Sequence, residues 1–123
     1  MITGSSTTKG RLALFNISRK GVSVKGNTAD LFTVGFGAQA KTDAILHEAK
    51  KKLEALTDID LGLALIKGPT SPTIAMLIAN FFVHHYGATA YFEQTLDAYV
   101  VVLAHGSDRK VGDLIPASDV ITL

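Results

Sequence analysis

Several residue types are missing from this chain, and each absence removes a class of protein. No cysteine is present among the 123 residues. This excludes a disulfide framework, a cysteine nucleophile and a thiolate metal site. The longest apolar run, Ile74 to Val83, contains Asn80 and is too short to span a bilayer. The net charge is only +1, which argues against a protein that coats long duplex nucleic acid.

The length and composition predict one globular domain. A chain of 123 residues has room for one hydrophobic core, and 47% of its residues are hydrophobic. Residues 1–10 are polar and small, without the apolar stretch of a secretion signal. We therefore expect a flexible N-terminal arm at residues 1–10 and a single domain over residues 11–123. We also expect a soluble, cytoplasmic protein without a membrane segment.

The first half of the domain predicts strands followed by a helix. Apolar and polar residues alternate over residues 11–18, which is typical of a strand. Residues 21–24 are expected to be its hairpin partner, with one turn near residues 19–21 and another at Gly26 and Asn27. Residues 42–56 carry an apolar stripe at helical spacing, and the apolar run of residues 61–66 predicts a central strand.

The second half begins with a helix that carries clear boundary signals. Ser71 is suited to the N-cap and Pro72 to the first helical position, and the helix is expected to end at Tyr86 before a left-handed Gly87. Nearly every side chain between these ends is apolar. Such a helix is buried on two sides, and we expect a second subunit to supply the second cover, which predicts a homodimer.

The remaining segments complete an α/β domain. Residues 88–92 and 98–104 are expected to be strands, the latter apolar on both faces and therefore central. A turn at residues 111–115 and an edge strand at residues 119–123 follow. The order predicts an α/β fold with a mixed sheet and two main helices.

Chemically active residues lie at the ends of these expected elements. The loop Gly68-Pro69-Thr70-Ser71 precedes the second helix, His84 and His85 end it, and Glu93 and His105 each follow a strand. Rigid elements hold their terminal residues in place while the side chains still reach solvent. The pattern favours a site for a small anion or a phosphodiester. The same residues also fit a plain turn with a good N-cap, a solvated glutamate and helix-capping histidines.

The order of these motifs resembles one small CRISPR-associated family. The motifs are Gly68-Pro69 with Ser71, the apolar helix ending in histidines and Tyr86, the acidic Glu93, the valine strand before His105, and residues 111–115. They are similar to the Csx-three family of ring nucleases, which open cyclic oligoadenylate messengers. The resemblance implies a Rossmann-like fold related to CARF domains and a homodimer. It also implies cyclic tetra-adenylate as substrate, manganese as cofactor and a role in switching off type III CRISPR signalling.

The resemblance assigns roles to residues of this chain. His84 matches the family's catalytic histidine, and His105 matches the histidine after the valine strand. Glu93 stands at the acidic catalytic position, so His84 and Glu93 are the expected manganese ligands. The loop of Gly68, Pro69, Thr70 and Ser71 and the neighbouring His85 are expected to bind the ligand.

Three functions are left open by the residues themselves. The family's Asp-Pro-Arg/Lys-Leu motif reads Glu93-Gln94-Thr95-Leu96 here, so the basic residue is missing. A ring nuclease would use a metal that polarises the phosphate, or His84 as a proton-transfer group for attack by the ribose 2′-hydroxyl. A sensor or sink would bind the messenger without cleaving it, and the altered motif favours this alternative. The third function is a structural α/β dimer whose histidines only cap and pack.

Overall fold

The computed structural model describes residues 12–57, 59 and 62–123. The arm expected at residues 1–10 lies outside this part of the chain. Within the described residues, no helix has the length and apolar character needed to cross a membrane.

A long hairpin opens the fold. β1 (Phe15–Val24) and β2 (Asn27–Phe36) pair antiparallel along their full length, from Phe15 opposite Phe36 to Val24 opposite Asn27. The turn lies at Lys25 and Gly26, which have φ angles of 50° and 86° and so match the two-residue turn that joins twisted strands. The predicted turn at Gly26 is confirmed. The predicted turn near residues 19–21 is wrong, because β1 continues through them in register with β2.

The rest of the described chain adds two helices and five short strands. They are α1 (Thr42–Glu54), β3 (Leu63–Lys67), α2 (Pro72–Val83), β4 (Ala88–Glu93), the 3-10 turn η1 (Gln94–Leu96), β5 (Ala98–Ala104), β6 (Leu114–Pro116), the 3-10 turn η2 (Ala117–Asp119) and β7 (Val120–Thr122). All strands belong to one seven-stranded sheet of order β6-β5-β4-β3-β2-β1-β7. The structure is therefore an α/β fold with a mixed sheet and two helices, as the sequence predicts.

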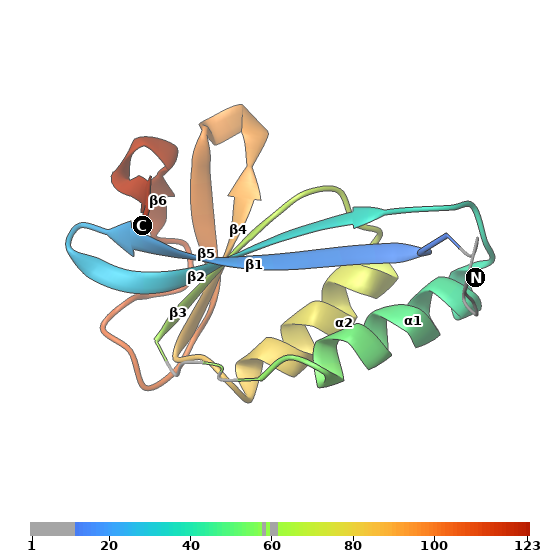
Figure 1. Cartoon of the computed structure of the whole chain (residues 1–123). Helices are drawn as coiled ribbons and strands as arrows, with labels where there is room; N and C mark the ends of the chain where they lie inside the picture. The colour runs from blue at the N-terminus through green and yellow to red at the C-terminus, as the bar shows by residue number, and fades with distance from the viewer. Residues whose placement is uncertain (1–11, 58, 60–61) are drawn as a thin grey trace.

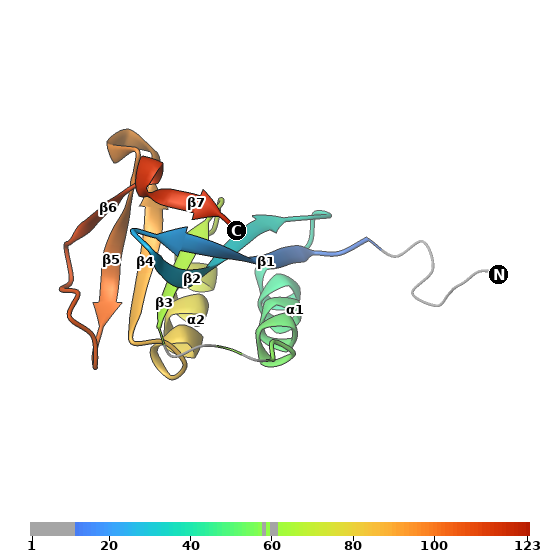
Figure 2. The same ribbon diagram turned by 60° about the vertical axis from the view of Figure 1, so that its left-hand side comes forward.

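Both helices cover the same face of the sheet. β2, β3 and β4 are parallel neighbours, so each helix connects one strand to the next in the same direction across the sheet. Because such crossovers are right-handed, two steps in one direction place both helices on one side. Figures 1 and 2 show α1 and α2 side by side beneath the sheet.

The first core lies between these helices and the sheet. α2 buries Ile74, Ile78 and Phe82 there, and the Phe82 ring lies 4.8 Å from that of Phe32 in β2. The buried members of this core are Phe15, Phe32, Val34, Ala49, Leu53, Ala64, Ile66, Ile74, Ile78, Phe82 and Tyr86.

A second core lies on the opposite face, where no helix is present in the described part of the chain. β6 and β7 stand at the two ends of the strand order, yet only the three residues of η2 separate them in sequence. So short a connection spans roughly 14 Å at most, so the sheet must curl until its edges approach each other. Figure 2 shows this curl. It encloses the buried residues Val22, Val24, Ala29, Leu31, Leu63, Leu65, Ala88, Ala90, Tyr99, Val101 and Ile115.

The surroundings of α2 differ from the sequence-based expectation. Leu77 and Phe81 pack against the first core, beside α1, whereas Met76 is 75% exposed. The second cover of α2 is thus supplied partly by α1 of the same chain. The helix ends at Val83 rather than Tyr86, and Gly87 does not have a positive φ angle.

β5 is also less buried than expected. It lies between β4 and β6, but a register shift beside Thr89 and Ala90 of β4 leaves Val102 without a partner in β4. Val102 is 44% exposed, so β5 is not buried on both faces along its whole length.

Candidate functional site

The loop from Gly68 to Ser71 joins the end of β3 to the start of α2. Gly68 has a φ angle of 125°, and a Cβ added to it would overlap the carbonyl oxygen of Val34 in the neighbouring strand. Only glycine avoids this overlap, and only glycine adopts this φ angle without strain. The close approach of the loop to β2 therefore fixes the path of the chain into α2.

Hydrogen bonds hold the loop in place. The Tyr91 hydroxyl donates to the Gly68 carbonyl oxygen at 2.6 Å and lies 3.1 Å from the Thr70 hydroxyl oxygen. The Ser71 hydroxyl oxygen accepts from the backbone N–H of Ile74 at 3.4 Å, which confirms Ser71 as the N-cap. Tyr91 was not predicted as a site residue. Neighbouring residues of a strand face opposite sides of the sheet, and Tyr91 of β4 faces the side that carries α2, whereas Ala90 faces the other side.

A cleft of about 590 Å³ opens beside this loop. Its lining residues are Lys67, Gly68, Pro69, Phe92 and Gln94. The Lys67 ammonium lies 5.0 Å from the centre of the Phe92 ring, which is a cation–π contact. Tyr99 packs edge-on against the same ring at 5.1 Å, and burial raises the pKa of the Tyr99 hydroxyl. The cleft thus combines a lysine, an aromatic ring, an amide and the first part of the loop that leads into α2.

Lys67, Phe92 and Gln94 were not predicted as site residues. Lys67 is the last residue of a buried strand and directly precedes Gly68-Pro69, and this position could have marked it as a site residue. Phe92 lies near the same edge of the sheet because β3 and β4 are parallel neighbours. The carboxyl ends of parallel strands are where α/β folds place their ligands.

Glu93 lies at this edge but already has a structural role. Its carboxylate accepts from the Thr95 hydroxyl at 2.9 Å and from the Thr95 backbone N–H at 3.4 Å. Glu93 therefore acts as the N-cap of η1, although its side chain remains exposed.

The histidines gather at the other end of α2. His84 is the exposed C-cap residue, and His85 stacks on the Phe81 ring at 4.4 Å. A His105 ring nitrogen lies 2.6 Å from the Val83 carbonyl oxygen, so His105 caps the end of α2. His84 and His85 also line a small crevice of about 160 Å³ between α1 and α2, together with Lys50 and Glu54.

One chain does not bring the two groups of predicted site residues together. α2 has 12 residues, so about 18 Å of helix separates the Gly68–Ser71 loop from His84. Glu93 pairs with Ala98 and Ala88 with Ala104, which places Glu93 at the opposite end of the β4–β5 ladder from His105. Within one chain, His84 and Glu93 therefore do not fit a shared manganese site. The described residues contain no group of three or more histidine or carboxylate side chains that could hold a metal ion.

Comparison of this chain with protein-family models, with curated proteins and with solved structures gave no match.

Proposed function

We propose that this protein binds a cyclic oligoadenylate, with cyclic tetra-adenylate as the first ligand to test, in the cleft beside the Gly68–Ser71 loop. The observation that carries the proposal is the presence of Lys67, Phe92 and the Gly68–Pro69 part of the loop in one cleft of about 590 Å³. This volume lies within the range of small-molecule sites, roughly 300–1,000 Å³. The resemblance to ring nucleases supplies the ligand class.

Each part of the cleft suits one part of a nucleotide. The Lys67 ammonium attracts a phosphate, and the positive N-terminal end of α2 follows directly after the loop. An adenine ring can stack on Phe92 in place of the lysine side chain that now covers it. The Gln94 amide can donate to and accept from a base edge.

We further propose that cleavage takes place between two copies of the chain. A phosphate bound at the loop is about 18 Å of helix away from His84 of the same chain. In a homodimer or larger assembly, His84 of one copy would accept the proton of the ribose 2′-hydroxyl bound by the other. The 2′-oxygen then bonds to the adjacent phosphorus, the bond from phosphorus to the ribose 5′-oxygen breaks, and the 5′-oxygen takes a proton from water, which leaves a 2′,3′-cyclic phosphate and a 5′-hydroxyl. His105 would support this end by capping α2. The described residues of one chain do not supply a fitting ligand set for manganese.

A second candidate function is capture of the messenger without cleavage. The observation that favours it is the engagement of Glu93 as the cap of η1, where both contacts of its carboxylate go to Thr95. The neighbouring positions Gln94 and Thr95 also lack the basic residue of the family motif. Such a protein would act as a sensor or a sink.

The relation to CARF domains is likewise a proposal. It is supported by the parallel order of β2, β3 and β4 with a crossover helix between each pair. The placement of both helices on one face differs from a doubly wound sheet, which carries helices on both faces.

Binding is tested with fluorescent cyclic tetra-adenylate and two cleft variants. Lys67→Ala and Phe92→Leu should each weaken binding by about tenfold or more, since each removes a phosphate or base contact. Lys51→Ala on α1 is the matched control, because Lys51 is exposed and far from this loop in sequence and fold. Unchanged affinity in both cleft variants would remove the proposed site, and absence of binding by the wild type would favour the structural dimer.

Cleavage is tested by chromatography of the unlabelled ring with and without manganese. Linear products from the wild type and a fall of roughly a hundredfold in His84→Ala would support the ring nuclease. A tight complex that keeps the ring intact would support capture. Mixing His84→Ala with Lys67→Ala protein should restore part of the activity, because one site of each mixed pair keeps both residues.

A further inference from the structure

β1 has an outer edge that is only partly covered. β2 pairs with the whole of β1 on one side, whereas β7 pairs on the other side only with Val22, Ser23 and Val24. No strand of the described part of the chain lies beside the outer edge at Ile17. Asn16 and Ser18 are exposed and Ile17 is partly exposed, so solvent reaches this stretch.

Side chains of α1 take the place of a partner strand at the start of this edge. The Glu48 carboxylate accepts from the backbone N–H of Phe15 at 3.1 Å and from that of Leu14 at 2.8 Å. The Lys52 ammonium donates to the Phe15 carbonyl oxygen at 2.5 Å. Both backbone groups of Phe15 therefore point away from β2.

The direction of the Ile17 backbone follows from this arrangement. In a strand the N–H and C=O groups of one residue point to the same side, and the side alternates along the chain. The Gly21 carbonyl oxygen accepts from Leu123 at 3.4 Å, so it too points away from β2. Ile17 has the same parity as Phe15 and Gly21, and its N–H and C=O groups therefore face the open edge.

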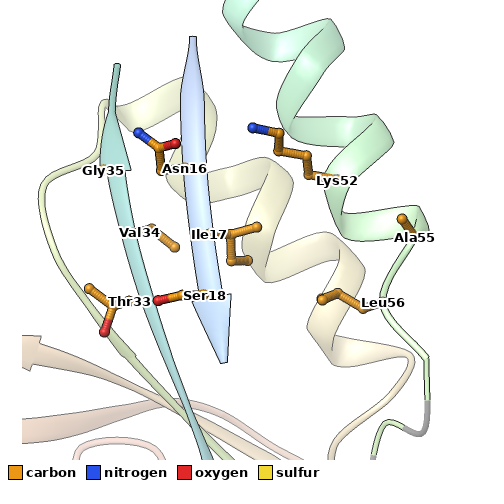
Figure 3. Close-up of a pocket in the computed structure, with 9 residues that line it drawn as sticks. All are labelled: Asn16, Ile17, Ser18, Thr33, Val34, Gly35, Lys52, Ala55 and Leu56. Carbon is orange, nitrogen blue, oxygen red and sulfur yellow. The ribbon is translucent and has the colours of Figure 1, made fainter. Parts of the chain in front are cut away.

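A cleft of about 590 Å³ adjoins this edge. In Figure 3, β1 lies between β2 and α1, and the labelled side chains of β1 and α1 border the cleft. They are Asn16, Ile17 and Ser18 from β1 and Lys52, Ala55 and Leu56 from α1 and the residues after it. The lining contains one lysine and no carboxylate.

We propose that this edge and cleft bind an extended, acidic peptide segment of a partner protein, which adds to the sheet as a strand beside β1. The Ile17 N–H and C=O groups match the backbone of an extended segment, which can bond to both of them as a neighbouring strand does. An apolar side chain of the peptide fits against Ile17 and Leu56. Acidic side chains of the peptide are attracted by Lys51 in the last turn of α1, whereas the charge of the neighbouring Lys52 is already balanced by Glu48.

Charge decides against a second copy of this chain as the occupant. Two copies paired through β1 would bring Lys51 of both α1 helices to the same edge. Lys51 has no ion pair among the described residues, whereas Lys52 already pairs with Glu48 of its own helix. Like charges at such a junction oppose pairing, whereas an acidic strand gains from it.

The test uses a fluorescent eight-residue peptide that alternates valine and glutamate, with anisotropy as the readout. N-methylation of the peptide amides that face β1 should abolish binding, and N-methylation of the amides that face away should leave it unchanged. Replacing the glutamates with lysines should weaken binding at least about tenfold. Ala55→Glu should weaken binding to a similar extent, whereas Ala44→Glu, at an exposed position near the start of α1, should not.

Amide hydrogen exchange at Ile17 provides the second measurement. Exchange should be fast in the free full-length chain and slow when the peptide is bound. Protection in the free chain that depends on protein concentration would overturn the proposal in favour of a second copy. If the Ile17 amide is protected at every protein concentration, and deletion of residues 2–10 removes this protection, the proposal is overturned. The occupant of the edge would then be the chain's own N-terminal residues. Equal binding of both N-methylated peptides would exclude strand addition.

Discussion

Glu48 links α1 to the start of β1, and its removal should lower stability measurably. Its carboxylate accepts two backbone N–H groups and pairs with Lys52 at 3.1 Å, while 19% of the side chain is exposed. Hydrogen bonds to a charged group contribute roughly 1.5–3 kcal/mol each when protected, and less when solvent reaches them. We expect Glu48→Ala to lower the free energy of unfolding by about 2 kcal/mol, or about 6 to 10 °C in Tm.

The pH dependence of this effect follows from the direction of the pKa shift. The Phe15 N–H bond is the largest cause that holds the pKa of Glu48 below its ordinary value of 4.5, with Lys52 and Leu14 also contributing. The folded state therefore favours the ionised carboxylate, and the resulting stabilisation is present above pH 4.5. It is lost as the pH falls through the folded-state pKa.

Urea unfolding of the wild type and Glu48→Gln across this pH range is the decisive assay. Glutamine keeps the acceptor oxygen but not the charge, so we expect a gap of about 1 kcal/mol at neutral pH that closes in acid. Glu54→Gln is the matched control, since Glu54 lies on the same helix and has no ion pair among the described residues. A gap of equal size at pH 3 and pH 7 would refute the electrostatic explanation.

Three further changes test the packing of the sheet and of the Gly68–Ser71 loop. Thr89→Val should raise the free energy of unfolding, measured by urea titration, by about 1 kcal/mol. The reason is that the buried Thr89 hydroxyl has no hydrogen-bond partner among the described residues. A loss of stability would show that a partner exists. Gly68→Ala should lower the free energy of unfolding by more than about 3 kcal/mol, because the added Cβ would overlap the Val34 carbonyl oxygen. The control Gly35→Ala should lower it far less, because open space surrounds the Gly35 Cα. Tyr91→Phe should lower the free energy of unfolding by about 1 kcal/mol and speed amide hydrogen exchange at Thr70 and Ser71. Unchanged exchange at these two residues would show that the Tyr91 hydroxyl does not hold the loop.

Local signals in the sequence located most of the elements. Ser71 and Pro72 marked the start of α2 because capping and the fixed φ of proline depend only on neighbouring residues. The apolar stripe of α1 and the turn at Gly26 were found for the same reason. The chain order of strands and helices then sufficed for an α/β fold with a mixed sheet.

Features that depend on distant contacts were missed. The end of α2 was misplaced because the His105 side chain, from another strand, caps it instead of a left-handed Gly87. The continuity of β1 through residues 19–21 is set by its ten-residue pairing with β2, which no local pattern reveals.

Local sequence patterns were enough to identify the residues that could carry chemistry and the segments that begin and end the main elements. Which of these residues meet depends on the packing of distant segments. This packing placed Lys67 and Phe92 beside the loop and left His84 at the far end of α2, because parallel β3 and β4 end at one edge while the helix between them runs back to the other. It also curled the sheet around a second core and left the edge of β1 open at Ile17, since these depend on which strands pair rather than on the residues within each strand.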